Sequence, residues 1–189
     1  MKQEVKQIDQ LLLEEELIRK AQTDPKAFRP LYERYYKMIF LFVLHRIGDK
    51  ELTADITSQV FLKAMINIEK FKFRGLPFSA WLYRIAINEC HDFFRRTKRE
   101  RLVVLEDASV GLLYEEMFGE DAMEDMKRKL PAILEKLTPD ELQVIELRFL
   151  EGRPFKEVAE ILGVTETYAK VRTYRILDKM KKIFIKRVV

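Results

Sequence analysis

The sequence predicts an all-α protein in which two helical domains are joined by an acidic linker. Apolar residues recur at three- and four-residue spacing over long stretches on both sides of this linker, which is the period of an amphipathic helix. Only six glycines and six prolines occur among 189 residues, which suits helices better than the many turns of an all-β fold. Hydrophobic residues make up 48% of the chain, enough for one or two cores.

An N-terminal helical bundle is expected over residues 1–101. Its first clear helix follows Thr23 and Asp24, has Pro25 at its first position and should end at Gly48. Its predicted buried stripe consists of Phe28, Leu31, Tyr32, Tyr35, Ile39 and Phe42. Asp49 can cap the next helix, whose apolar set is Leu52, Ile56, Val60 or Phe61, and Met65.

A loop and a long helix complete this first domain. Residues 71–77 (FKFRGLP) are expected to form the loop, because Gly75 and Pro77 interrupt regular structure. The helix should run from about Pro77 to Lys98. Its expected apolar side is Phe78, Trp81, Leu82, Ile85 and Phe93. We expect Cys90, in the middle of this helix, to be a buried and inert thiol.

Residues 102–126 are interpreted as the linker. They contain eight acidic residues and no lysine or arginine. Five large apolar residues nevertheless indicate that part of the linker docks on another surface: Leu112, Leu113, Tyr114, Met117 and Phe118.

A C-terminal domain is expected over residues 127–189. Thr138-Pro139-Asp140-Glu141 has the pattern of a capping box, and the helix that it begins carries Leu142, Ile145, Leu147 and Phe149. A shorter helix over about 154–162, the turn 163–165 and a last helix over about 166–182 follow. A helix, a three-residue turn that contains glycine and a second helix form the helix-turn-helix pattern.

Basic residues gather at the ends of both domains. Residues 154–187 contain nine basic and four acidic residues, and the long helix of the first domain ends with Arg95, Arg96, Lys98, Arg99 and Arg101. Such clusters are typical of nucleic-acid binding, because lysine and arginine neutralise phosphates. Cations at solvated helix ends would look the same, so charge alone leaves both interpretations open.

The last helix separates into two faces. Helical spacing places Thr167, Lys170, Val171, Tyr174 and Arg175 on one face, with Arg172 on its flank. Ala169, Thr173, Ile176 and Met180 lie roughly opposite and are expected to face inward. The first face has the long donors that a major groove requires, although a helical hairpin that binds protein would fit the same pattern.

Several functional classes are disfavoured. Cys90 is the only cysteine, and His45 and His91 show no ligand spacing, so we expect no metal site and no intrachain disulfide. We find no nucleophile–base pair and no phosphate loop, and therefore expect neither an enzyme nor a cofactor. The N-terminus lacks the apolar core of a signal peptide and no apolar stretch approaches the ~18 residues of a membrane span, so we expect a cytoplasmic protein without membrane insertion.

Three segments, in order, resemble the extracytoplasmic-function (ECF) sigma factors of bacterial RNA polymerase. FRGLPFSAWLYRIAINECHDFFRR (73–96) closely resembles their promoter-melting region, above all in Trp81 to Ala86 followed by Asn88. ADITSQVFLKA (54–64) is similar to their polymerase-clamp helix. LTPDELQVIELRFLEGRPFKEVAEILGVTETYAKVRTYRI (137–176) is similar to their domain that reads the upstream promoter element.

The resemblance implies a sigma factor that directs core polymerase to promoters and melts DNA, with core polymerase, promoter DNA and an anti-sigma factor as partners. It implies that Phe73, Arg74, Asn88, Arg95 and Arg96 contact the downstream element, with Phe73 and Asn88 near a pocket for a flipped base. Upstream-element contacts are implied for Thr165, Thr167, Lys170, Val171, Arg172, Tyr174 and Arg175. Polymerase contacts are implied for Asp55, Ile56 and Gln59, whereas Phe61 and Trp81 are expected in the core. The acidic linker is expected to thread into the nucleic-acid channel of polymerase.

The chain departs from the family pattern at three places. Ser58 and Gln59 stand where the family usually has Gln and Glu, Ile87 stands where it usually has Arg, and Glu166 and Tyr168 alter the helix-turn-helix. The alternative functions are a DNA-binding regulator that does not melt promoters and a structural helical bundle.

Overall fold

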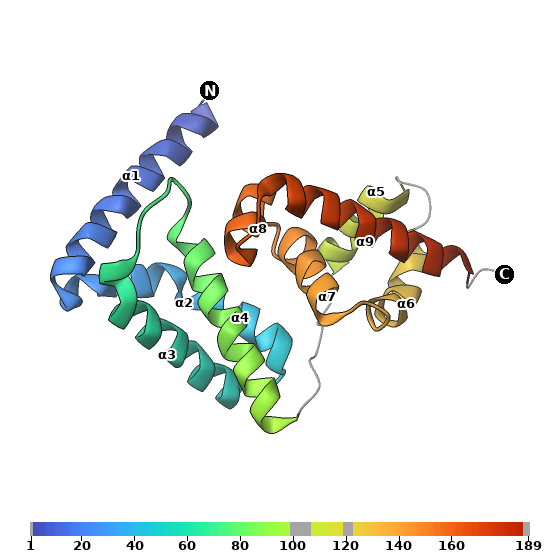
Figure 1. Cartoon of the computed structure of the whole chain (residues 1–189), viewed down its shortest axis with the longest axis horizontal. Helices are drawn as coiled ribbons and strands as arrows, with labels where there is room; N and C mark the ends of the chain where they lie inside the picture. The colour runs from blue at the N-terminus through green and yellow to red at the C-terminus, as the bar shows by residue number, and fades with distance from the viewer. Residues whose placement is uncertain (1, 99–106, 119–122, 187–189) are drawn as a thin grey trace. The chain divides into compact units, whose positions relative to one another are not determined.

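The computed structural model describes residues 2–98, 107–118 and 123–186, and these residues fold into helices joined by turns and loops (Figure 1). The chain divides into two units, Met1–Val104 and Leu105–Val189. Each unit has its own buried core, as expected for two all-α domains. No helix within the described ranges is long and apolar enough to cross a membrane.

The first unit packs α2, α3 and α4 against one another, and α1 lies against the loop that leads into α4 (Figure 1). Its elements are α1 (Lys2–Thr23), η1 (Pro25–Phe28), α2 (Arg29–Ile47), α3 (Lys50–Asn67), η2 (Ile68–Lys70) and α4 (Phe78–Thr97). Residues 71–77 form the predicted loop between η2 and α4.

Local signals set the helix boundaries as predicted. Gly48 ends α2 with a φ of 74°, a left-handed conformation that glycine adopts without strain. Asp49 begins α3, because its carboxylate accepts hydrogen bonds from the backbone N–H groups of Glu51 (2.9 Å) and Leu52 (3.0 Å).

The core of the first unit confirms most of the predicted apolar stripes. Phe42 and Tyr83 meet edge to face with their ring centroids 4.6 Å apart, and Phe61 and Cys90 are buried as expected. Two predicted core residues, Tyr32 and Met65, are exposed instead. Tyr32 lies on the flank of α2, where its ring packs on Phe61 near the surface.

Helix α1 was not predicted, because its charged sequence shows only a short leucine run. Two of these leucines, Leu12 and Leu13, are in fact exposed. Over residues 10–23, where burial is described, the buried residues of α1 are Glu14, Ile18 and Ala21, which include a carboxylate. The face of α1 that packs inward is therefore partly polar, and hydrophobic periodicity does not detect it.

The second unit packs four shorter helices around the long helix α9 (Figure 1). Its elements are α5 (Asp107–Phe118), α6 (Met123–Leu134), α7 (Pro139–Ile145), the π-helical η3 (Glu146–Leu150), α8 (Phe155–Leu162) and α9 (Glu166–Lys186). Thr138 and Glu141 form the predicted capping box at the start of α7. Gly163, with a φ of 69°, ends α8 and begins the turn to α9.

Part of the segment predicted as a linker (102–126) is helical in the structure. Residues 107–118 form α5, which packs on α6, η3 and α9, and α6 begins at Met123 rather than near Lys127. Leu113 and Met117 are buried in this unit, as expected for a segment that docks. Two apolar residues one helical turn apart outweigh the acidic composition, so this part of the chain belongs to the second unit and is not a free tether.

Replacing Leu113 by alanine should destabilise the second unit and release α5. A buried Leu→Ala change costs about 2–5 kcal/mol in the free energy of unfolding. Leu112→Ala is the matched control, because Leu112 is 56% exposed and its loss should change stability by less than about 0.5 kcal/mol. Hydrogen exchange read by mass spectrometry should show lost protection in α5 only for Leu113→Ala. Equal protection of α5 in both variants would mean that α5 does not dock through Leu113.

Candidate nucleic-acid interface

The outer face of α9 carries the side chains that the sequence analysis assigned to DNA. Thr167, Lys170, Val171, Tyr174 and Arg175 are all exposed. On the opposite face, Ala169, Thr173, Ile176 and Met180 are buried in the second unit, as expected. One face of α9 is therefore anchored in the core, and the other presents long donors and apolar groups to solvent.

The turn before α9 gives Thr165 a structural role. Its hydroxyl accepts a hydrogen bond from the backbone N–H of Tyr168 (3.2 Å), so Thr165 caps the first turn of α9. Two departures from the family pattern lie in the same turn. Glu166 pairs with Lys170 at 2.8 Å, and Tyr168 is exposed.

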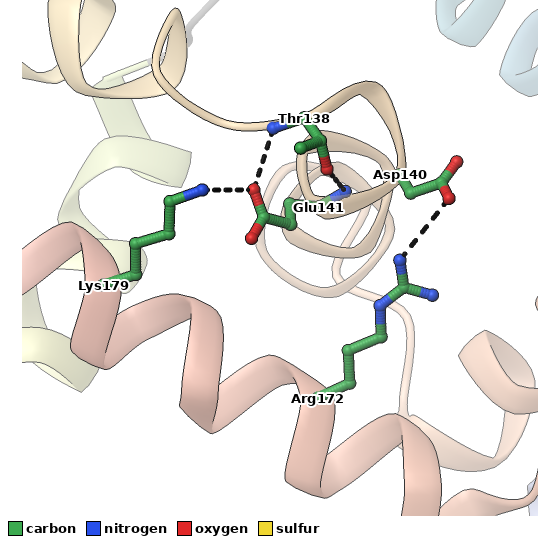
Figure 2. A network of polar contacts seen from close by, with 5 residues as sticks. All are labelled: Thr138, Asp140, Glu141, Arg172 and Lys179. Atoms are coloured by element: carbon green, nitrogen blue, oxygen red, sulfur yellow. Dashed lines mark hydrogen bonds and ion pairs between the residues drawn. The ribbon is translucent and has the colours of Figure 1, made fainter.

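Two cations of α9 reach the start of α7 (Figure 2). Lys179 pairs with Glu141 at 2.6 Å, and the same carboxylate accepts a hydrogen bond from the backbone N–H of Thr138 (2.8 Å). Arg172 lies 3.7 Å from Asp140. The structure thus turns Arg172 toward α7, which agrees with its expected position on the flank of the outer face of α9.

The Lys179–Glu141 pair changes the protonation of Glu141. Partial burial by itself raises the pKa of this carboxyl, but the hydrogen bonds from Lys179 and Thr138, together with the lysine charge, bring the pKa below its ordinary value of 4.5. The ionised form is therefore favoured in the folded unit.

The contribution of Glu141 to stability should depend on pH in the acidic range. A carboxyl whose pKa falls on folding stabilises the protein fully above its unfolded pKa and loses this effect as the pH drops through its folded pKa. Glu141→Gln should therefore lower the melting temperature by a constant amount above about pH 5.5, and the difference should shrink below about pH 4.5. Glu135→Gln, at an exposed turn position, controls for the loss of a carboxyl elsewhere. A Glu141→Gln difference that stays constant down to about pH 3 would contradict this assignment.

A pocket of about 440 Å³ lies in the first unit between the end of α3, η2 and the middle of α4. Phe71 and Trp81 form an aromatic wall, with ring centroids 4.9 Å apart. Lys63 and Glu89 both line the pocket and form an ion pair with each other. The complete lining is Lys63, Asn67, Lys70, Phe71, Trp81, Ile85, Asn88, Glu89 and Asp92. The pocket thus combines flat aromatic surface with hydrogen-bonding and charged groups.

Of the residues predicted to contact the downstream element, only one lines this pocket. Asn88 lines it, whereas Phe73 and Arg74 lie in the adjoining loop and do not line it. Arg95 and Arg96 are exposed on the last turn of α4, and Arg95 pairs with the pocket residue Asp92 at 2.8 Å. Trp81 is half-buried, so it is part of the pocket wall as well as of the core edge.

Sequence reasoning missed six lining residues: Lys63, Asn67, Lys70, Phe71, Glu89 and Asp92. They come from separate elements that meet only in the folded unit, and no local pattern marks them. The structure also explains why Ile87 stands where the family usually has Arg. Ile87 is buried and contributes to the core.

The exposed face of α3 contains two of the three predicted polymerase contacts. Asp55 and Gln59 are exposed, but Ile56 is only 8% exposed and packs in the core. Ile56 thus belongs to the apolar set predicted for this helix, about 100° around the helix from the exposed Asp55, and its role as a polymerase contact stays a prediction. Leu62 and the 65%-exposed Ile66 continue the exposed face. They were missed because neither belongs to the apolar stripe of α3.

Comparisons with known proteins agree over both units. Residues 31–100 match the family model of Sigma-70 region 2, and residues 133–182 match that of Sigma-70 region 4. The chain is 30% identical over 171 residues to the ECF RNA polymerase sigma factor BldN of Streptomyces coelicolor, covering 89% of this chain and 64% of that protein. It is 26% identical over 162 residues to the ECF sigma factor SigX of Bacillus subtilis, covering 83% of each.

Two solved structures share the fold. One is CnrH in complex with the cytosolic domain of CnrY, with a TM-score of 0.60, 21% identity and coverage of 92% of this chain and 97% of that one. The other is the sigma factor RpoE in complex with the anti-sigma factor NepR from Bartonella quintana. Its TM-score is 0.55, with 19% identity and coverage of 85% of this chain and 98% of that one.

Proposed function

We propose a division of labour between the two units, on the premise that the chain belongs to the extracytoplasmic-function sigma factors, which direct RNA polymerase to promoters. The second unit reads duplex DNA of an upstream promoter element through α9. The first unit binds core polymerase through α3 and captures an unpaired base of the downstream element beside Asn88.

The pocket beside Asn88 is the observation that carries this proposal. A helix-turn-helix alone would suit a regulator that leaves DNA paired, whereas a pocket is useful only for a base that has left the stack. Flipping a base costs a few kcal/mol, and stacking it on an aromatic ring returns about 1–3 kcal/mol. The wall of Phe71 and Trp81 provides such a stacking surface, and Asn88 provides both a donor and an acceptor.

The α9 face supports reading of the duplex. Arg175 is long enough to donate to both N7 and O6 of a guanine, and Val171 can contact a thymine methyl group. Lys170 and Tyr174 lie on the same face. Arg172, which is turned toward Asp140, serves a phosphate or the packing of α7 on α9.

The exposed face of α3 supports a protein contact. Asp55 and Gln59 supply polar groups, and Leu62 and Ile66 supply apolar surface that has no core function. Core polymerase is the partner that we assign to this face. By likeness to CnrH and RpoE, whose structures were both solved in complex with a protein partner, we assign an anti-sigma factor as a second partner of the chain.

Co-purification with core polymerase separates this function from that of a simple DNA-binding regulator. The full chain should elute with core polymerase during gel filtration, and Gln59→Ala combined with Ile66→Ala should weaken the complex. A chain that binds duplex DNA but never elutes with core polymerase would instead be a regulator.

Replacing Asn88 by alanine should impair promoter melting and little else. The pocket acts only once a base is unstacked, so binding to core polymerase and to upstream duplex should stay near normal. Permanganate footprinting on a linear promoter should show reduced thymine reactivity. Gln59→Ala is the reciprocal control, because it should lower affinity for core polymerase yet leave thymine reactivity normal once the complex is saturated. Unchanged reactivity with Asn88→Ala would remove Asn88 from the mechanism.

Arg175→Ala and Lys182→Ala should weaken DNA binding in different ways. Loss of a bidentate base contact should cost about 1–3 kcal/mol and relax one position of the upstream element. Loss of a phosphate contact should weaken all sequences alike. Selection from a randomised duplex library by the second unit (residues 105–189) distinguishes the two effects. If both changes weaken every sequence equally, the face assigned to base reading is wrong.

A further inference from the structure

The loop of residues 71–77 builds one side of the Asn88 pocket. Phe71, the first residue of the loop, lies in the pocket wall, and Trp81 follows on the first turn of α4. At the middle of the loop, Gly75 has a φ of 68°, and among the described residues no atom lies within 4 Å of a Cβ built there. The chain is therefore open around Gly75, and the hydrogen bonds from α1 to this segment lie at the two ends of the loop.

Gln22 of α1 holds the first end of this loop. Its side-chain amide donates hydrogen bonds to the backbone carbonyls of Ile68 (3.0 Å) and Phe71 (2.9 Å). One amide group carries two donors, and both are used here on backbone acceptors that lie 46 and 49 residues away in the sequence. The position of the Phe71 backbone is therefore tied to α1.

Glu14 of α1 holds the second end. Its carboxylate, only 2% exposed, accepts hydrogen bonds from the backbone N–H of Phe78 and from the hydroxyl of Tyr35 (2.8 Å). Phe78 is the first residue of α4, and the residue at the N-cap, Pro77, has no side-chain oxygen to cap the helix. Glu14 performs this capping from another helix, where a negative charge is also favoured by the helix dipole.

The spacing of the two residues matches the loop that they hold. Glu14 and Gln22 are eight positions apart, so they lie on the same face of α1 two turns from each other. Ile18 and Ala21, between them, are buried and fix that face against the unit. Both residues precede position 31, where the Sigma-70 region 2 match begins.

We propose that Glu14 and Gln22 are positioning residues for base capture: α1 sets the course of the 71–77 loop and thereby the place of Phe71 and Trp81 in the pocket. This inference rests on the proposed function, since it states that α1 sets the geometry of the pocket proposed to capture a base. The two residues act through the loop and do not touch the base.

The test measures base preference at the captured position. Full-length chain and core polymerase are combined with four promoter templates that differ only in the base at that position, and open-complex formation is followed by permanganate reactivity. Wild type should prefer one base. Glu14→Ala and Gln22→Leu should flatten this preference by about tenfold, because each leaves buried hydrogen-bonding groups of the backbone unsatisfied and frees one end of the loop. Affinity for core polymerase should stay unchanged.

Matched variants separate positioning from general damage. Glu15→Gln and Glu16→Gln alter neighbouring carboxylates that pair within α1, with Arg19 at 2.8 Å and Lys20 at 2.7 Å, and they should keep the preference. Glu14→Gln, which retains a hydrogen-bond acceptor, should keep part of the base preference that Glu14→Ala loses. If Glu14→Ala fails to fold, the Gln22→Leu variant decides the test. The side chain of Gln22 is only half-buried, so its replacement should disturb folding less. Hydrogen exchange of a peptide that covers residues 71–77 should rise in Gln22→Leu and not in Glu15→Gln.

The outcomes distinguish the inference from its premise. Wild type without any base preference would overturn the base-capture function itself. If wild type shows a base preference and both Glu14→Ala and Gln22→Leu retain it in full, only the positioning role of α1 is overturned. Loss of preference in Glu15→Gln as well as in Glu14→Ala would also overturn it, since the effect would then follow from any change in α1.

Discussion

A helix that presents side chains to a ligand must bury its other face in its own unit, and α9 and α4 both meet this constraint. In α9 the buried face includes Thr173, whose hydroxyl donates to the backbone carbonyl of Ala169 at 2.8 Å and so enters the core without an unsatisfied group. In α4 the buried residues Leu82, Tyr83 and Ala86 play the same part. The residues left in solvent are then fixed in direction by the core, which is the rigidity that a recognition surface requires.

The same constraint explains why polar contacts secure the ends of these helices. Lys179 and Glu141 join α9 to the start of α7, and Glu14 caps the start of α4 from α1. Each contact links segments that are far apart in the sequence, so each also fixes the placement of one helix relative to another. Hydrophobic burial supplies most of the stability of each unit, and these hydrogen-bonded carboxylates add a smaller part and supply the alignment.

Features that depend on neighbouring residues were predictable from the sequence, and features that depend on distant residues were not. Gly48, Asp49 and Thr138 act within a few positions, so the helix boundaries that they set were anticipated. Helix α1 escaped prediction because its buried Glu14 finds partners 21 and 64 positions away. A pocket near Asn88 was implied by the family resemblance, but most of its lining escaped for the same reason, since Lys63 and Glu89 lie on different helices. Helix α5 was read as part of a linker because of its acidic composition, although its two buried residues, Leu113 and Met117, were among those that indicated docking.

The central claim is that this chain gives core polymerase the ability to start transcription at chosen promoters. Run-off transcription with core polymerase on a pool of genomic promoter fragments, read by sequencing the transcripts, tests it most directly. The account predicts transcripts that begin at discrete positions downstream of one shared pair of sequence elements, and only when the chain is present. Transcripts that are the same with and without the chain would contradict it.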